Sequence, residues 1–342
     1  MLAVGRARDV LSHMPVLDPS SLPDEAIPRA MLLLSFFGHA YVFQTWQHDV
    51  AANLPASIAR PWVEVAARLG RPPILSYASY ALDNWRRLDP EGPIALGNLA
   101  LLQNFLGGLD EEWFVTVHVQ IEAEAAPALQ ATSSVLNAVA AESVGGVLEA
   151  LGTIAAALEN MNRTLKRMPE GCDPYVYYHR VRPFIHGWQQ HAVTYEGVAE
   201  DAGTPRSYYG ETGAQSTIVP CLDAALGIRH QQDELRTYLS AMRTYMPRGH
   251  VAFLSALEAG PSVRSFVLAC SDSRLVAAYD TCVAGVEEFR STHLDYASRY
   301  IQKQAQVGVN STQYGTGGTP FMRYLKKHRD ETRNERPRVD SA

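Results

Sequence analysis

The feature that most constrains this fold is a long helical repeat of apolar side chains in the last quarter of the sequence. Between positions 275 and 300, apolar residues and one histidine recur every three or four positions: Leu275, Tyr279, Cys282, Val286, Phe289, His293, Ala297 and Tyr300. This spacing places them on one side of an α-helix. The sequence therefore predicts a long amphipathic helix that buries one face, with His293 in that face.

Other segments follow the same periodicity. Apolar residues at helical spacing predict helices over 144–168 and 233–246, each followed by a proline. The segment 115–121 alternates apolar and polar residues as a strand does, but the Ala- and Glu-rich run directly after it favours a helix. We expect an all-α protein.

Turn-forming residues suggest how the chain is divided. The run LDPEGP at 88–93 predicts a boundary, so we expect a small N-terminal domain over residues 1–105 and a large helical domain over 106–342. A Gly-, Ser- and Thr-rich loop at 306–319 separates the long helix from a last helical segment, and a loop of that length is disordered or functional.

Composition excludes several classes of function. The 30 basic and 36 acidic side chains leave a formal charge of −6, which argues against nucleic-acid binding. The longest apolar stretch, 30–43, is shorter than the roughly 20 residues of a membrane-spanning helix, and no secretory signal is evident at the N-terminus. The four cysteines form no C-x-x-C pair, so neither a zinc knuckle nor covalent haem attachment is predicted. We expect a cytoplasmic protein without membrane association.

His293 allows two interpretations. A histidine in an apolar stripe can be a core residue that hydrogen-bonds a backbone carbonyl, or it can be the axial ligand of a haem iron whose apolar neighbours form the haem wall. Periodicity does not choose between these. The spacing of His186 and His191 does not fit a helical metal pair, so a zinc hydrolase is not predicted.

Arg182 and a glycine-rich segment are further candidates for a binding site. Arg182 lies among several aromatic residues, where it could hold a carboxylate through two hydrogen bonds or simply stack on a tyrosine at the surface. The segment GTGGT at 315–319 lacks the Lys and Ser/Thr pair of a phosphate-binding loop.

Five ordered sequence blocks together resemble the indoleamine 2,3-dioxygenase family. They are PPILSYASYALDNW at 72–85, YYGETGAQSTIVPCLDAALGI at 208–228, YMPRGHVAFLSALEAGPSVRSFVLAC at 245–270, AYDTCVAGVEEFRSTHLDYASRYI at 278–301 and GTGGTPFMRYLKKHRDET at 315–332. The resemblance extends from about residue 28 to residue 332. It implies a small N-terminal domain over a large helical one, noncovalently bound haem b, and O2 as co-substrate.

The resemblance also implies roles for individual residues. His293 in RSTHL would be the proximal haem ligand, with Arg290 and Asp223 orienting the ring and balancing charge near the propionates. The segment WFVTVHVQIEAEAAP at 113–127 matches the distal side of the family's site. The substrate pocket would be formed by Tyr77, Tyr80, Phe114, Tyr177, Arg182 and Thr316. In the family pattern the arginine holds the substrate carboxylate, the phenylalanine lies against the indole, and the threonine lies near the ammonium.

One position departs from the common eukaryotic pattern. Alignment places His118 where those members have a serine, and a distal histidine is a feature of the related tryptophan 2,3-dioxygenases. We therefore expect a bacterial member of the family in which His118 accepts a hydrogen bond from the indole N–H. A neutral imidazole is required, so turnover should fall as the pH drops through about 6.5. The alternative is that His118 pairs with Glu122, one turn further along the helix.

The function implied by the resemblance is insertion of both atoms of O2 across the indole C2–C3 bond of L-tryptophan, which gives N-formylkynurenine and enters the kynurenine pathway. An unidentified reductant would be needed. His118, Tyr80 and Tyr177 keep open an oxygenase for a modified tryptophan or another indole in secondary metabolism. A non-catalytic haem sensor or carrier is disfavoured, because it has no evident use for Arg182 or the GTGGT loop.

Overall fold

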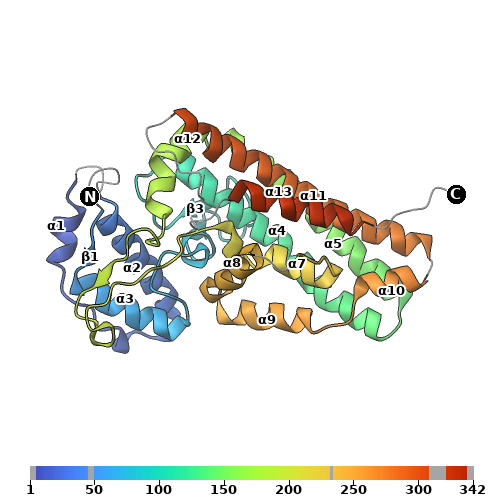
Figure 1. Cartoon of the computed structure of the whole chain (residues 1–342), viewed down its shortest axis with the longest axis horizontal. Coiled ribbons are helices and arrows are strands. Elements are labelled where there is room, and N and C mark those ends of the chain that lie inside the picture. Colours follow the sequence, from blue (N-terminus) through green and yellow to red (C-terminus); the bar gives the residue numbers. More distant parts are fainter. Residues whose placement is uncertain (1–4, 45–49, 232–233, 271, 308–320, 337–342) are drawn as a thin grey trace.

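The computed structural model describes residues 5–44, 50–231, 234–270, 272–307 and 321–336. Within these residues the chain is predominantly helical, as predicted, with only four short strands (Figure 1). Most of the predicted loop at 306–319, including Thr316, lies outside the described residues, as does the end of the chain after residue 336.

The N-terminal end of the molecule is a cluster of short helices with small strand pairs. Its helices are α1 (Ala7–Ser12), α2 (Ile27–Val42) and α3 (Ala56–Leu69). Strand β1 (Asn53–Leu54) pairs in parallel with β4 (Thr194–Tyr195), and β2 (Trp85–Arg87) pairs antiparallel with β3 (Leu99–Leu101). The pairing of β1 with β4 ties a later part of the chain to this end.

Long helices form the larger part of the molecule. They are α4 (Leu109–Ala140), α5 (Val144–Leu165), α11 (Ser273–Ala297) and α13 (Phe321–Asn334). Helix α5 packs against both α4 and α11, and α13 lies along α11 (Figure 1). Side-chain caps fix where two of them begin: the Ser143 hydroxyl accepts from the Gly146 amide at 3.2 Å, and the Asp272 carboxylate accepts from the Arg274 amide at 2.8 Å. The two longest predicted helices are thus confirmed.

The remaining helices complete the large part. They are α6 (Pro174–Val176), α7 (Ile218–Leu226), α8 (Glu234–Met242), α9 (Arg248–Glu258), α10 (Val263–Cys270) and α12 (Lys303–Val307). One stretch of the described chain, 248–270, is long and apolar enough to cross a membrane by length and composition alone. In the structure it is divided into α9 and α10 at residues 259–262.

Helix α4 lies between two hydrophobic cores, and this explains its unusual sequence. Val115 and Val119 pack into a core shared with α2, α3 and residues 184–198, whereas Val117 and Ile121 pack into the core of α5, α7 and α11. Residues two apart point about 200° apart on a helix, so alternating apolar residues serve both cores. The helix predicted for 115–121 is confirmed, and the strand-like alternation reflects burial on two sides.

Candidate functional site

A third face of α4 lies between its two core-facing sides. Phe114, His118 and Glu122 follow one another at intervals of four residues and therefore share this face. The Phe114 ring packs against both cores, and its centroid lies 4.6 Å from that of His118. The candidate site is thus built at the junction of the two cores.

The orientation of His118 is fixed by its own helix. Its Nδ1 lies 2.7 Å from the carbonyl oxygen of Phe114, so Nδ1 carries the proton and donates to that oxygen. This leaves Nε2 as a hydrogen-bond acceptor. Burial lowers the pKa of His118, although the bond to Phe114 opposes the shift. The neutral form therefore persists to lower pH than the value of about 6.5 used in the sequence prediction.

Glu122 and Ser216 are site residues that the sequence prediction missed. The carboxylate oxygen Oε1 of Glu122 accepts hydrogen bonds from the Tyr77 and Ser216 hydroxyls, each at 2.8 Å. Burial raises the pKa of Glu122, and these two bonds counteract it. The alternative in which His118 pairs with Glu122 is therefore not what the structure shows. The interval of four residues from His118 was the signal that could have placed Glu122 here.

Aromatic side chains surround this face. The Tyr77 ring meets the His118 ring edge-on at 6.0 Å, and Tyr177 and Tyr80 lie 4.8 and 6.4 Å from Phe114 between ring centroids. Tyr80 lies in one π-helical turn, η4 (Ala78–Leu82), and Tyr177 begins another, η6 (Tyr177–Val181). Such turns occur often at functional sites. The structure thus brings together the aromatic residues predicted for the pocket.

Arg182 directly follows the second of these turns and is only 2% exposed. Its guanidinium lies 5.4 Å from the Tyr178 ring centroid. Burial lowers its pKa, and the neighbouring Tyr177 opposes that shift. The interpretation of Arg182 as an ordinary surface residue is wrong, because it is a buried cation beside the aromatic cluster.

Glu211 is a second buried acid that the sequence did not reveal. It is 4% exposed, and burial raises its pKa to about 8. Its charge in turn contributes to raising the pKa values of Tyr77, Tyr80 and Tyr177, so it lies near all three. Nothing in its local sequence distinguished it from a surface acid.

His293 lies on the inward face of α11 but is not packed into the core. Val286, Ala297 and Tyr300 of the same stripe are at most 6% exposed, whereas the His293 side chain is accessible. Burial among protein atoms, with a smaller contribution from His118, nevertheless lowers the pKa of His293 to about 4. The electrostatic contribution of His118 places the two imidazoles near each other, and the core does not cover the His293 ring.

Arg290 and Asp223 form a bidentate ion pair behind this face. The Arg290 nitrogens lie 3.0 and 2.6 Å from the two Asp223 oxygens. Burial raises the pKa of Asp223, but the interactions with Arg290 and His230 lower it by more, so that it lies at about 2. Arg290 also donates to Thr332. The structure confirms that the two residues meet, although among the described residues neither hydrogen-bonds the His293 ring.

These residues fit a haem group. A neutral imidazole is the protonation state that coordinates iron, and His293 offers an accessible neutral imidazole in the neighbourhood of His118. A core histidine would need partners for its ring nitrogens, and among the described residues His293 has no hydrogen bond. His293 would supply the ligand to the iron, and the sequence has no C-x-x-C-H motif for covalent attachment.

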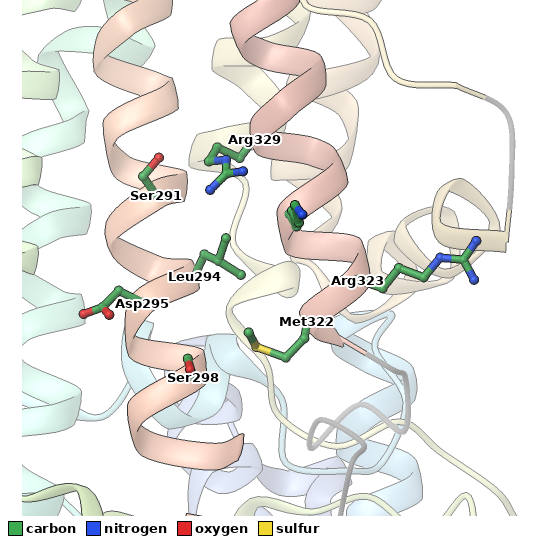
Figure 2. A pocket seen from close by; sticks show the side chains of 8 residues that line it. Ser291, Leu294, Asp295, Ser298, Met322, Arg323 and Arg329 are labelled. Atoms are coloured by element: carbon green, nitrogen blue, oxygen red, sulfur yellow. The ribbon is translucent and has the colours of Figure 1, made fainter. Parts of the chain in front are cut away.

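A separate cavity of about 520 Å³ lies between α11 and α13 (Figure 2). It is lined by Ser291, Leu294, Asp295 and Ser298 of α11 and by Met322, Arg323, Lys326 and Arg329 of α13. At 100° per residue, this side of α11 faces away from His293. The cavity therefore lies on a different side of α11 from His293.

Comparison with known proteins gives the family. The model of the indoleamine 2,3-dioxygenase family matches residues 1–335. Indoleamine 2,3-dioxygenase 1 of Rattus norvegicus is 35% identical over 347 residues, covering 96% of this chain and 84% of the rat protein. The chain belongs to the indoleamine 2,3-dioxygenase family. It is accordingly a haem-dependent dioxygenase with O2 as its co-substrate.

Two further relatives show the breadth of this family. Indoleamine 2,3-dioxygenase 2 of Homo sapiens is 34% identical over 340 residues, covering 94% of this chain and 83% of the human protein. A protein of Haliotis madaka named myoglobin is 30% identical over 342 residues, covering 97% of this chain and 88% of its own length. Proteins with an oxygenase name and with an oxygen-carrier name thus both resemble the chain along nearly its whole length.

Proposed function

We propose that this dioxygenase acts on L-tryptophan, cleaving the indole C2–C3 bond to give N-formylkynurenine, the entry step of the kynurenine pathway. The observation that carries the proposal is the buried Arg182 beside the aromatic cluster of Phe114 and Tyr177. A buried cation next to apolar rings suits a flat aromatic molecule that carries a carboxylate.

The distal residues would position the substrate. Phe114 and Tyr77 flank the indole, with Tyr80 and Tyr177 completing the pocket wall. Arg182 holds the carboxylate, and the family pattern assigns the ammonium to Thr316, which lies outside the described residues. The Nε2 atom of His118 accepts a hydrogen bond from the indole N–H, for which its neutral form and fixed Nδ1 proton are suited. His118 need not remove that proton, because an indole N–H is a very weak acid.

The proximal residues would hold the cofactor. Haem, when bound, supplies the oxygen chemistry. His293 would hold the haem iron, and the Arg290 and Asp223 pair would set the charge on the same side of the cofactor. The protein would work in the cytoplasm with an unidentified reductant, without nucleic acid or membrane as a partner.

Product analysis tests the proposal. Haem-loaded protein is incubated with a reductant, ¹⁸O2 and, in parallel reactions, L-tryptophan, ring-substituted tryptophans and tryptamine. We expect N-formylkynurenine that carries two ¹⁸O atoms, with L-tryptophan as the best substrate. Faster turnover of a substituted indole would instead support a role in secondary metabolism.

The Haliotis relative named myoglobin supports one second candidate, an oxygen carrier. A carrier would bind O2 reversibly and leave the indole unchanged in the same reactions. The buried Arg182 argues for the enzyme, because a carrier has no carboxylate to hold.

A further inference from the structure

Three metal-ligating side chains meet on the far side of the Arg290–Asp223 pair. They are His230, in the loop after α7, and His328 and Glu331 of α13, and their ligand atoms all lie within 4.8 Å of one another. The Nδ1 atom of His230 lies 2.7 Å from Oε2 of Glu331. The two imidazole rings stack with their centroids 4.0 Å apart.

The geometry points to a binding site for a divalent transition-metal ion, with Zn²⁺ as the best-matched ion, formed by His230, His328 and Glu331. Two imidazoles and one carboxylate are a donor set that zinc accepts, with water as the fourth ligand. His328 and Glu331 are three residues apart on α13 and so share one face of that helix. This site is separate from the haem site and does not depend on the proposed function.

The hydrogen-bond pattern around His230 is the one a metal ligand needs. Its Nε2 atom lies 3.0 Å from Oδ2 of Asp223, while Nδ1 faces Glu331. The Asp223 carboxylate therefore holds the ring in the orientation that presents Nδ1 to the ion. Ligating histidines usually donate their second N–H to such a carboxylate. On binding, the ion replaces the proton between Nδ1 of His230 and Glu331, and that proton leaves to solvent.

Only small movements are required for coordination. Two ligands of a tetrahedral zinc ion lie about 3.4 Å apart. The pair formed by His230 and Glu331 must therefore open slightly, and His328 must turn about its Cβ–Cγ bond to leave the stack. Lys327, whose Nζ lies 3.6 Å from Glu331, must swing into solvent, whereas Arg290 remains paired with Asp223. The His230 and Glu331 side chains are each 12% exposed, which leaves the ion a way in.

The ion would link elements that are distant in sequence. It would join α13 to the loop after α7, and through Asp223 to Arg290 on the haem-binding helix α11. Bound metal should therefore stabilise the packing of α13 on α11.

Equilibrium dialysis of haem-loaded protein against buffered Zn²⁺ tests the site. Haem loading keeps His293 from binding zinc, and metal analysis counts ions per chain. We expect saturable binding of one ion and a rise in Tm on adding ZnCl2. His328→Ala and Glu331→Gln should each weaken binding at least about tenfold and abolish the rise.

The matched control is His13→Ala, which removes an exposed histidine directly after α1 and should bind zinc like the wild type. Each variant must keep the wild-type Soret band and zinc-free Tm, and if His328→Ala does not fold, Glu331→Gln decides. Absence of saturable binding to the wild type, or equal affinity in the variants that fold, overturns the site.

Discussion

The distal and proximal sides of the candidate site are organised in different ways. On the distal side, side chains are held by the protein itself, because His118 bonds to Phe114 and Tyr77 bonds to Glu122. On the proximal side, Arg290 and Asp223 bond to each other, while among the described residues the His293 ring has no hydrogen bond.

This difference implies that the distal side controls substrate positioning and the proximal side controls haem binding. A distal pocket that is preorganised without ligand can position a substrate at little cost in ordering. On the proximal side, no hydrogen bond among the described residues orients the His293 ring, so binding of haem would orient it. Distal substitutions should therefore change kinetics at constant haem content, and proximal substitutions should change haem content itself.

The largest effect is expected for His293→Ala, which removes the proposed axial ligand. The purified variant should contain little haem after expression that saturates the wild type, as measured by Soret absorbance per protein. His118→Ser is the control and should retain full haem content. A variant of His293 with the normal Soret band and full activity would contradict both the assignment and the contrast between the two sides.

Arg182→Lys should give the next largest effect. A lysine ammonium cannot reproduce the two parallel hydrogen bonds of a guanidinium. Truncating a buried charge pair costs about 2 to 5 kcal/mol, so KM for L-tryptophan should rise about 30-fold or more at unchanged haem content. Tryptamine, which has no carboxylate, is the internal control, and its kinetics should differ little between wild type and variant. If the wild type turns over tryptamine as efficiently as tryptophan, Arg182 does not hold the carboxylate.

The sequence predicted where the helices and the candidate site residues lie better than it predicted how exposed those residues are and what they contact. Helical spacing placed His293 in the apolar stripe of α11. It could not show that His293 is exposed while Val286 and Ala297 are buried, since exposure depends on which helices approach α11. Arg182 was located by resemblance, whereas its burial follows from its place between Val181, which packs into one core, and Phe184, which packs into the other.

Residues whose importance arises from long-range contacts escaped prediction. Glu122 meets Tyr77 and Ser216 from parts of the chain 45 and 94 positions away. No local pattern encodes such a meeting. The shift in the pKa of His118 likewise depends on burial, which one sequence does not specify.

Tyr77→Phe tests whether the distal side is held by the protein. The change removes one of two hydrogen bonds to the partly buried Glu122 and leaves the ring in place. A hydrogen bond to a charged group contributes about 1.5 to 3 kcal/mol, which is an upper limit here because Ser216 remains. We expect kcat/KM for L-tryptophan to fall by roughly tenfold with haem content unchanged. Tyr41→Phe, which alters a partly buried tyrosine of α2, is the control. Equal loss in both variants would indicate a general effect on stability.

The smallest effect, and the sharpest test of the distal arrangement, is the pH dependence of turnover. Neutral His118 accepts the indole N–H, and protonation of Nε2 removes the acceptor. Because burial lowers the pKa of His118, activity is retained below pH 6.5 and is lost only as the pH falls through the lowered value.

Other groups that face His118 titrate elsewhere or can be controlled. His293 would hold the haem, so Soret absorbance must be constant across the measured range to exclude haem loss. Glu211, with a pKa of about 8, affects the alkaline side of the pH profile of kcat/KM, and Glu211→Gln removes this titrating group. Glu122 has a raised pKa and is tested by Glu122→Gln.

His118→Ser should flatten the acid limb of kcat/KM and relax discrimination against 1-methyltryptophan by a few-fold. The methylated compound lacks the N–H donor, so it cannot donate a hydrogen bond to His118, and its methyl group would clash with the imidazole. Serine is smaller and leaves room for the methyl group. The measurement is kcat/KM for tryptophan and 1-methyltryptophan in both proteins between about pH 5 and 8, a range around the ordinary histidine pKa of about 6.5. Identical pH profiles and equal ratios of kcat/KM for the two substrates in both proteins would contradict the proposed role of His118. Its hydrogen bond to Phe114 would then only fix the ring against its own helix, and Phe114, Tyr77 and Arg182 would position the substrate without a hydrogen bond to the indole N–H.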